Sequence, residues 1–162
     1  MEEIISYLEI TALSELRPAK VKSGLTLEPV DAGSPLIREL HTRIGTPYSW
    51  PGVTRSDEDW AGWLALPRCY RLVKYRKEVA GIADFEPQQD GEVEITTFGL
   101  LPEYIGRGLG GHALTLAVEQ AWQVEPLGGE PLRRVWLHTS TRDHPNALTN
   151  YLRRGFRPFQ TR

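Results

Sequence analysis

The chain has 162 residues, of which 40% are hydrophobic and 25% are charged, so it is long enough to bury a core, and wholesale disorder is excluded. Its one cysteine, Cys69, excludes an intramolecular disulfide and a thiolate metal cluster. The net charge of −2 conceals an asymmetry, because residues 131–162 contain seven arginines and one acidic residue, a net charge of +6, whereas residues 1–130 carry a net charge of −8. Such an asymmetry indicates that the two parts face different partners.

Composition also limits the location and the partners of the protein. No apolar run approaches the roughly 18–20 residues that a membrane span requires, and the acidic start Met1-Glu2-Glu3 differs from the basic start of a signal peptide. We therefore expect a cytoplasmic protein without a membrane partner. The sequence pI of about 6.1, and the alternation of the C-terminal arginines with apolar residues, speak against nucleic acid as a partner.

In chain order, the first part of the sequence predicts an extension, a strand and two helices. Residues 1–22 are predicted to be an N-terminal extension, and residues 24–29 alternate apolar and polar side chains as a strand does. A helix is expected over residues 34–44, ended by Gly45-Thr46-Pro47. A second helix is expected to begin at Ser56, an N-cap residue that three acidic residues follow.

The middle of the chain predicts three neighbouring strands and a helix. Residues 69–75 and 79–85 flank a charged turn, which is typical of an antiparallel hairpin, and a third strand is expected at 92–101. After Pro102 and a cluster of glycines, apolar residues recur with helical spacing at positions 114, 117, 118, 121 and 122.

The end of the chain predicts a strand at 134–140, a short helix at 145–154 that opens with proline, and a last short strand that starts at Gly155. The resulting order, β-α-α-β-β-β-α-β-α-β, predicts an α/β protein with a mixed sheet rather than regular alternation of strands and helices. We expect residues 23–162 to form one domain.

The glycine-rich segment before the central helix predicts a phosphate cradle. Gly106, Gly108, Gly110 and Gly111 let the backbone approach a ligand closely, and N–H groups at a helix N-terminus bind phosphate. Arg107 adds a fixed positive charge. The spacing also satisfies the Gly-x-Gly-x-x-Gly pattern of dinucleotide-binding folds, but four residues separate the strand from the first glycine, and no acidic residue ends the next strand. A simple tight turn is the remaining alternative, and the loop alone does not say whose phosphate it binds.

Two stretches of the sequence resemble a known family. Residues 94–114, EITTFGLLPEYIGRGLGGHAL, resemble the acetyl-CoA-binding motif of the GNAT superfamily of N-acetyltransferases, and residues 146–156, NALTNYLRRGF, look like its second signature. One departure falls at Ile105, where the family has arginine or glutamine, so this position offers only its backbone N–H. The resemblance implies a GNAT-like acyltransferase fold with three layers, α/β/α, and acetyl-CoA as co-substrate. It implies that the cofactor is held by the loop residues Ile105, Gly106, Arg107, Gly108, Leu109, Gly110 and Gly111.

The resemblance also implies chemical roles for single residues. Glu94 would act as the general base that deprotonates the amine, directly or through water, with Glu92 on the same face as its substitute. The backbone N–H of Leu100 would face the thioester carbonyl, Tyr151 would protonate the departing thiolate, and Asn146 would contact the pantetheine arm. A solvated strand carboxylate at Glu94 and an aromatic ring packed on its helix face at Tyr151 are the structural alternatives.

Aromatic residues between the two early helices predict an acceptor pocket. In the resembling fold this region borders the acceptor, so Tyr48, Trp50 and Trp63 are candidate walls for an apolar or cationic substrate. Trp60 and Trp63 are three residues apart, however, which fits packing in the core equally well.

A metal site is not expected. His138, Asp143 and His144 follow one another at positions i, i+5 and i+6 across a strand-to-helix turn, which fits no standard zinc pattern. Asp143 is better explained as the N-cap of the helix that follows.

Together these motifs favour an N-acetyltransferase that moves the acetyl group of acetyl-CoA to the primary amine of a small-molecule or peptide acceptor, by direct attack in a ternary complex. The alternative is a non-catalytic module that binds acyl-CoA as a sensor. The positive C-terminal part would face the phosphates of the cofactor, and the negative part would receive a cationic amine. Because the final strand is short, it would suit a homodimer in which another chain completes the sheet. The sequence does not identify the acceptor.

Overall fold

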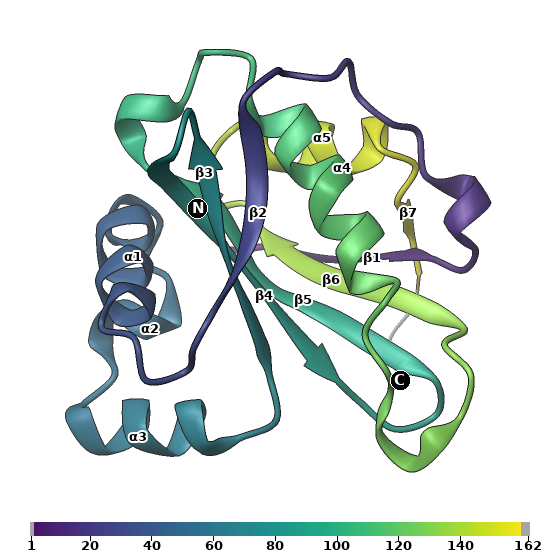
Figure 1. The fold of residues 1–162 in the computed structure, drawn as a ribbon, viewed down its shortest axis with the longest axis horizontal. Coiled ribbons are helices and arrows are strands. Elements are labelled where there is room, and N and C mark those ends of the chain that lie inside the picture. Colours follow the sequence, from purple (N-terminus) through teal and green to yellow (C-terminus); the bar gives the residue numbers. More distant parts are fainter. Residues whose placement is uncertain (1, 160–162) are drawn as a thin grey trace.

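The computed structural model describes residues 2–159, which form a seven-stranded mixed sheet between two layers of helices (Figure 1). The strands lie in the order β2-β3-β4-β5-β6-β1-β7. All neighbours pair antiparallel except β5 and β6, which are parallel. This arrangement confirms the predicted α/β class and its mixed sheet. The strands are β1 Ile5–Ile10, β2 Leu25–Val30, β3 Cys69–Tyr75, β4 Glu78–Pro87, β5 Glu92–Leu100, β6 Arg134–Ser140 and β7 Arg157–Pro158.

Five α-helices within residues 2–159 cover the two faces of the sheet. They are α1 Leu36–Gly45, α2 Pro51–Thr54, α3 Asp57–Ala65, α4 Gly110–Ala121 and α5 Ala147–Arg153. Helix α1 covers the face from which Asp84 projects, because its His41 binds that carboxylate. Helix α4 covers the opposite face, where its Gln120 binds Arg71 and Arg71 in turn stacks on Phe85, the next residue after Asp84. No helix among the described residues combines the length and the apolar character needed to cross a membrane.

Local sequence signals explain where the helices begin and which side they bury. Ser56 accepts a hydrogen bond from the backbone N–H of Asp59, and the Asp59 carboxylate accepts one from the backbone N–H of Ser56. This capping box starts α3 at the predicted place. The helical stripe predicted for α4 is buried against the sheet and includes Leu114, Ala117, Val118 and Ala121.

Strands β5 and β6 separate after a short paired stretch, which opens the sheet. Their parallel pairing covers only Glu92–Glu94 of β5 and Arg134–Trp136 of β6. Residues 95–100 of β5 pair with β4 on one side and have no strand partner on the other within the described sheet. A β-bulge at Thr96 adds to the local twist. The fold therefore leaves one edge of β5 facing a gap in the middle of the sheet.

The N-terminal segment supplies an inner strand of the same sheet. β1 pairs with β6 along its whole length and with β7 at Leu8 and Glu9, so that Leu8 and Ile10 are fully buried. Residues 1–22, predicted as an extension, thus contribute a strand to the core of the sheet. β7 pairs with β1 of the same chain and forms one edge of the sheet.

Candidate active site

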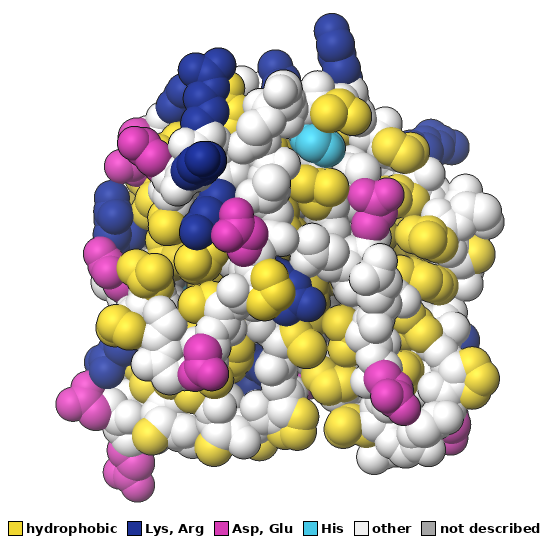
Figure 2. Space-filling model, in the orientation of Figure 1, with side chains coloured by type: hydrophobic (Ala, Val, Ile, Leu, Met, Phe, Trp, Pro, Cys, Tyr) yellow, Lys and Arg dark blue, Asp and Glu magenta, His cyan; other side chains and the backbone are white. Residues whose placement is uncertain are grey.

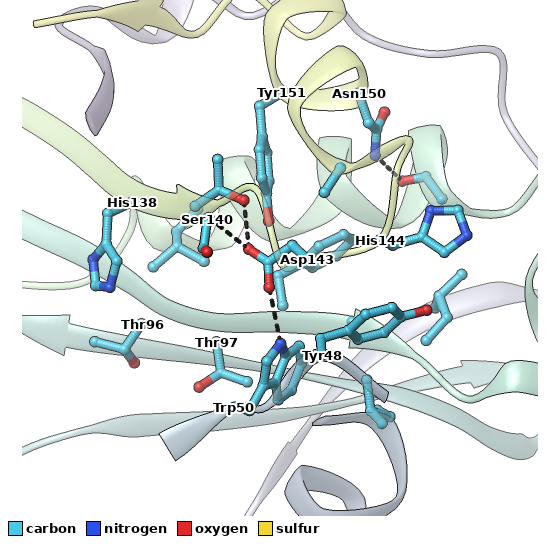
Figure 3. Close-up of a pocket in the computed structure, with 18 of the residues that line it drawn as sticks. Tyr48, Trp50, Thr96, Thr97, His138, Ser140, Asp143, His144, Asn150 and Tyr151 are labelled. Atoms are coloured by element: carbon cyan, nitrogen blue, oxygen red, sulfur yellow. Dashed lines mark hydrogen bonds between the residues drawn. The ribbon is translucent and has the colours of Figure 1, made fainter. Parts of the chain in front are cut away.

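A cavity of about 1010 Å³ opens where β5 and β6 separate (Figure 3). Its walls come from β5, the end of β6, the glycine-rich loop, α5 and the segment between α1 and α2. All but one of the site residues predicted from the sequence line this cavity. They are Glu94, Leu100, Ile105, Gly106, Gly108, Leu109, Gly110, Gly111, Asn146 and Tyr151, together with Tyr48, Trp50 and Trp63.

The free edge of β5 offers backbone N–H groups to the cavity. The N–H of Leu101 donates to the carbonyl oxygen of Ala80 on β4 at 2.7 Å, and N–H groups of successive residues in a strand point in alternate directions. The N–H groups of Leu100 and Phe98 therefore point away from β4, toward the side where β6 has separated. An N–H in this position can stabilise a carbonyl oxygen on which negative charge develops.

Glu94 is held at the cavity by two neighbouring side chains. It is 8% exposed, accepts a hydrogen bond from Gln88 Nε2 at 3.1 Å and lies 3.3 Å from His138 Nδ1. The hydrogen bond to Glu94 raises the pKa of His138 above its usual value, and burial opposes this effect. Glu92, the predicted substitute, lies outside the cavity lining and binds Arg134 at 2.8 Å. Of these two carboxylates, Glu94 is the one placed to take a proton inside the cavity.

The stability of the protein is expected to depend on pH through His138. Because the pKa of His138 is higher in the folded protein than its usual value of about 6.5, protonation favours the folded state. This stabilisation is complete below about pH 6.5 and is lost as the pH rises through the raised pKa. Melting temperatures of the wild type and of His138→Gln between about pH 5.5 and pH 9 test this. The advantage of the wild type should shrink as the pH rises, and an advantage that is independent of pH would contradict the prediction.

Tyr151 extends from α5 into the cavity, with its hydroxyl directed toward Asp143 (Figure 3). The residue is 8% exposed, and its ring packs edge-on against Phe156 with 6.0 Å between the ring centroids. Burial raises the pKa of Tyr151, and the carboxylate of Asp143 raises it further. The phenol is protonated at neutral pH, as an ordinary tyrosine is, and its position in the cavity allows it to donate a hydrogen bond or a proton to a group bound there.

Asp143 bridges the cavity instead of capping α5. Its carboxylate accepts hydrogen bonds from Thr139 Oγ1 at 2.5 Å, from the N–H of Ser140 at 3.0 Å and from Trp50 Nε1 at 3.1 Å (Figure 3). The predicted N-cap role is wrong, because Asn146 occupies the N-cap position, and its side chain makes no capping hydrogen bond. The bond to Trp50 joins the segment between α1 and α2 to the end of β6 across the cavity.

The two histidines considered with Asp143 as metal ligands lie in different surroundings. His138 faces Glu94, whereas the ring of His144 lies against Tyr48 with 6.1 Å between the centroids. Within residues 2–159, no three His, Cys, Asp or Glu side chains are arranged to hold a metal ion.

The glycine-rich loop and the start of α4 form one end of the cavity. Gly106 and Gly108 have φ angles of 80° and 75°, in the left-handed region that favours glycine. Helix α4 begins at Gly110, and its first N–H groups have no carbonyl one turn earlier in the helix to bind. These N–H groups, together with the positive end of the helix dipole, can bind a phosphate.

Two basic side chains that were not predicted from the sequence lie at this loop. A Cβ atom on Gly108 would lie 3.0 Å from Lys22 Nζ, and one on Gly111 would lie 2.8 Å from Arg154 Nη1. Burial, and then the charge of Arg153, lower the pKa of Arg154. A guanidinium beside the positive end of a helix is unfavourable unless an anion also binds there. Lys22 and Arg154 come from opposite ends of the chain, so only the folded structure brings them to the loop.

Arg107, the basic residue predicted to line the loop, is the exception among the predicted site residues. Its guanidinium lies over the rings of Tyr75 and Tyr104, 5.3 and 5.2 Å from their centroids, outside the cavity lining. Figure 2 shows Lys and Arg side chains gathered at the upper left, over the turn after β3 and the loop that leads into α4. The aromatic faces attract the guanidinium outward, away from the cavity.

Aromatic side chains form the other end of the cavity. Tyr48 and Trp50 come from the segment between α1 and α2, and Trp63 comes from α3. Trp60, by contrast, is 2% exposed and donates its Nε1–H to the carbonyl oxygen of Gly52 at 3.1 Å. The core interpretation therefore holds for Trp60, whereas Trp63 lines the cavity.

This cavity lies where two parallel strands separate and is lined at one end by the glycine-rich loop, an arrangement that fits an acyltransferase. The family model described as the Acetyltransferase (GNAT) family matches residues 37–156. The chain therefore belongs to the GNAT family of acetyltransferases, as its two sequence signatures predict.

Solved structures share the fold of this protein. A GCN5-related N-acetyltransferase from Kribbella flavida is 22% identical with a TM-score of 0.63, over 96% of this chain and 56% of that one. A second, from Sphaerobacter thermophilus, is 16% identical with a TM-score of 0.64, over 97% and 48% of the two chains. A tandem GNAT protein from the clavulanic acid biosynthesis pathway is 15% identical with a TM-score of 0.61, over 96% and 50%. The chain thus spans about half the length of these proteins. No curated protein matches the chain.

Proposed function

We propose that this GNAT protein transfers the acetyl group of acetyl-CoA to the primary amine of a small-molecule or peptide acceptor, by direct attack in a ternary complex. The observation that carries the proposal is that the glycine-rich loop, Glu94, Leu100 and Tyr151 all line the same cavity between β5 and β6. A thioester that enters from the loop end and an amine that enters from the aromatic end would meet there.

The residues at the loop end fit acetyl-CoA. The N–H groups of Gly106–Gly111 would bind the pyrophosphate, and Lys22 and Arg154 would supply positive charge beside it. Asn146 lines the same cavity and is the candidate contact for the pantetheine arm. The N–H of Leu100 would bind the thioester carbonyl oxygen.

Each step of the transfer then has a residue that supports it. Acetyl-CoA supplies the thioester when bound. Glu94 takes a proton from the ammonium group of the acceptor, which makes the nitrogen nucleophilic. The N–H of Leu100 stabilises the charge that develops on the carbonyl oxygen as the nitrogen–carbon bond forms. Tyr151 gives its proton to the thiolate as the carbon–sulfur bond breaks, and the second proton of the attacking nitrogen passes through solvent to the tyrosinate as the neutral amide forms. The products are the amide and CoA.

Arg154→Gln is expected to weaken acetyl-CoA binding about tenfold, because it removes a charge-assisted contact beside the loop. Arg107→Gln is the matched control. It also removes a guanidinium from the loop, but this guanidinium stacks on Tyr75 and Tyr104 outside the cavity. Its dissociation constant should stay within about twofold of the wild type. Isothermal titration calorimetry with acetyl-CoA measures both, and a larger loss in Arg107→Gln than in Arg154→Gln would contradict this arrangement.

The proposed activity is tested by the release of free CoA over a panel of primary amines, after a thermal-shift measurement that shows acetyl-CoA binding. Thiol release that depends on both acetyl-CoA and an amine would support the transferase. Binding of acetyl-CoA without thiol release for every amine would favour the alternative, a non-catalytic acyl-CoA sensor.

A further inference from the structure

The end of the cavity beneath α1 and α3 carries charges that the transfer step does not use. We call this part the inner end of the cavity. Glu86 on β4 is the strand partner of Glu94 on β5, so the inner end lies on the same face of the sheet as the proposed base. The inner end is lined by His41, Arg55, Trp63, Arg68 and Glu86.

The carboxylates at the inner end are already bound. Glu86 Oε2 lies 2.5 Å from Arg68 Nη2, and only 7% of the Arg68 side chain is exposed. Behind this wall, Asp84 Oδ2 lies 2.8 Å from His41 Nε2, and both side chains are buried. Each carboxylate thus has a basic partner of its own.

Arg55 is the cation without a carboxylate partner at the inner end. Its guanidinium stacks on the rings of Trp60 and Trp63, 4.8 and 4.6 Å from their centroids, and forms no ion pair within residues 2–159. Its Nη1 is buried without a hydrogen-bond partner among the described residues, and so is Nε of Arg68, which stacks on the same Trp63 at 4.0 Å. Removal from water, and then the charge of Arg68, lower the pKa of Arg55, but a guanidinium stays charged at neutral pH.

A charged group in a cavity wall that lacks a counterion is costly, and a ligand that brings an anion removes this cost. The planar fork of donors on a guanidinium matches the two oxygens of a carboxylate. Stacking on two indole rings fixes the orientation of this fork at Arg55. The inner end therefore has the chemistry of a carboxylate-binding site.

The distance from the inner end to Glu94 limits the size of the molecule that carries the anion. Gln88 Nε2 donates to Glu86 at 2.8 Å and to Glu94 at 3.1 Å, so one amide group touches both carboxylates. Neighbouring strands are about 4.8 Å apart, and Arg68 binds Glu86 directly. The Arg68 side of this wall therefore lies within about 10 Å of Glu94. Arg55 stacks on the same Trp63 ring as Arg68, so a small molecule suits this part of the cavity.

We propose that the acceptor is a small amino carboxylate, whose carboxylate binds Arg55 at the inner end of the cavity and whose amine lies beside Glu94. This inference rests on the proposed acetyl transfer and adds the chemical class of the acceptor. It predicts that amines which lack an anionic group, such as polyamines, are poor substrates.

Pairs of amines that differ only in a carboxylate test the proposal. Suitable pairs are leucine with 3-methylbutylamine, phenylalanine with phenethylamine, and 4-aminobutyrate with propylamine. In at least one pair, we expect the wild type to use the carboxylate member with a kcat/KM at least tenfold higher. Arg55→Gln should lower that value at least tenfold and leave the other member of the pair within about twofold.

Arg38→Gln is the matched control. Arg38 also stacks on Trp60, at 5.9 Å, but it is exposed, pairs with Asp57 at 2.7 Å and lies outside the cavity lining. This variant should leave kcat/KM unchanged for both members of each pair. A wild type that prefers no carboxylate member, or an Arg55→Gln variant that loses both members equally while it keeps its melting temperature, would overturn the proposal.

A binding measurement separates this inference from the proposed activity. Tryptophan fluorescence of the wild type, of Arg55→Gln and of Arg38→Gln is titrated with the same amino carboxylates, with and without CoA. Suppose that the wild type and Arg38→Gln bind the amino carboxylates saturably, that Arg55→Gln does not, and that no amine causes CoA release. This result would support the carboxylate-binding site and contradict the proposed acetyl transfer. Transfer to the amines with no binding of any amino carboxylate would keep the transferase and refute the site.

Discussion

Tyr151→Phe is expected to lower kcat about 100-fold while the dissociation constant of acetyl-CoA changes by less than about twofold. A tyrosine hydroxyl is protonated at neutral pH, and burial raises the pKa of Tyr151, so it stays protonated to a higher pH than usual. Phenylalanine keeps the ring that packs on Phe156 and removes only the proton donor. Within residues 2–159 the hydroxyl has no hydrogen-bond partner that its loss would leave unpaired. Steady-state kinetics with thiol detection and calorimetry with acetyl-CoA measure the two effects.

Tyr104→Phe is the control for this variant. The hydroxyl of Tyr104 donates to Glu78 at 3.1 Å, outside the cavity lining, and burial raises the pKa of Tyr104 as well. We expect its kcat to stay within about twofold of the wild type. Equal activity of Tyr151→Phe and the wild type would exclude Tyr151 from proton transfer and leave it the role of a packed aromatic ring, the alternative that its helical position also allows.

Much of the fold follows from local patterns. Ser56 begins α3 through a capping box, and the two charged residues Arg76 and Lys77, with φ angles of 52° and 71°, close the predicted hairpin as a two-residue turn. The place of β1 was not predictable in this way. The local sequence of β1 can indicate a strand but not its neighbours in the sheet. Its position between β6 and β7 depends on pairing with residues more than 120 positions away.

In the candidate site, too, the features set by local sequence were predictable and those set by contacts between distant residues were not. The glycine-rich loop and its helix are contiguous in sequence, so their motif reports a local shape that the fold preserves. The direction of a side chain on such a loop depends on what packs beside it, and Arg107 turns outward because Tyr75 comes from a different strand. The bond between Trp50 and Asp143 joins residues 93 positions apart, and no local spacing predicts it.

Ion pairs within the fold account for part of the charge asymmetry of the sequence. Of the six arginines in residues 131–159, four form ion pairs with acidic residues of the part before residue 131, namely Arg133, Arg134, Arg142 and Arg157. Three of the six line the cavity, namely Arg142, Arg153 and Arg154. Arg134 binds Glu9 at 3.1 Å and Arg157 binds Glu15 at 2.8 Å, so the positive part largely neutralises the negative N-terminal segment. Arg154 is the residue of this part that lies at the glycine-rich loop. The salt dependence of acetyl-CoA binding should therefore follow Arg154 and Lys22 rather than the net charge of residues 131–162.

Asp84→Ala is expected to lower the free energy of unfolding by about 3 kcal/mol, the usual cost of breaking a buried pair by removing one partner. Asp84 is fully buried, and its Oδ2 lies 2.8 Å from His41 Nε2. Without it, the buried His41 loses its hydrogen-bond partner beneath α1. For a chain of this length the loss corresponds to a fall of about 6–12 °C in melting temperature. Urea denaturation and thermal unfolding measure the effect.

Asp57→Ala tests whether burial is the cause. Asp57 binds Arg38 at 2.7 Å, almost the same distance, but 94% of the Asp57 side chain is exposed, so this variant should cost less than about 1 kcal/mol. Similar losses of stability in the two variants would contradict the argument.

The buried pair of His41 and Asp84 also supports the wall of the cavity, because the ring of His41 packs against Trp50 and Trp63. In Asp84→Ala the KM for the acceptor should therefore rise, while the affinity for acetyl-CoA, which binds at the loop end, should change little.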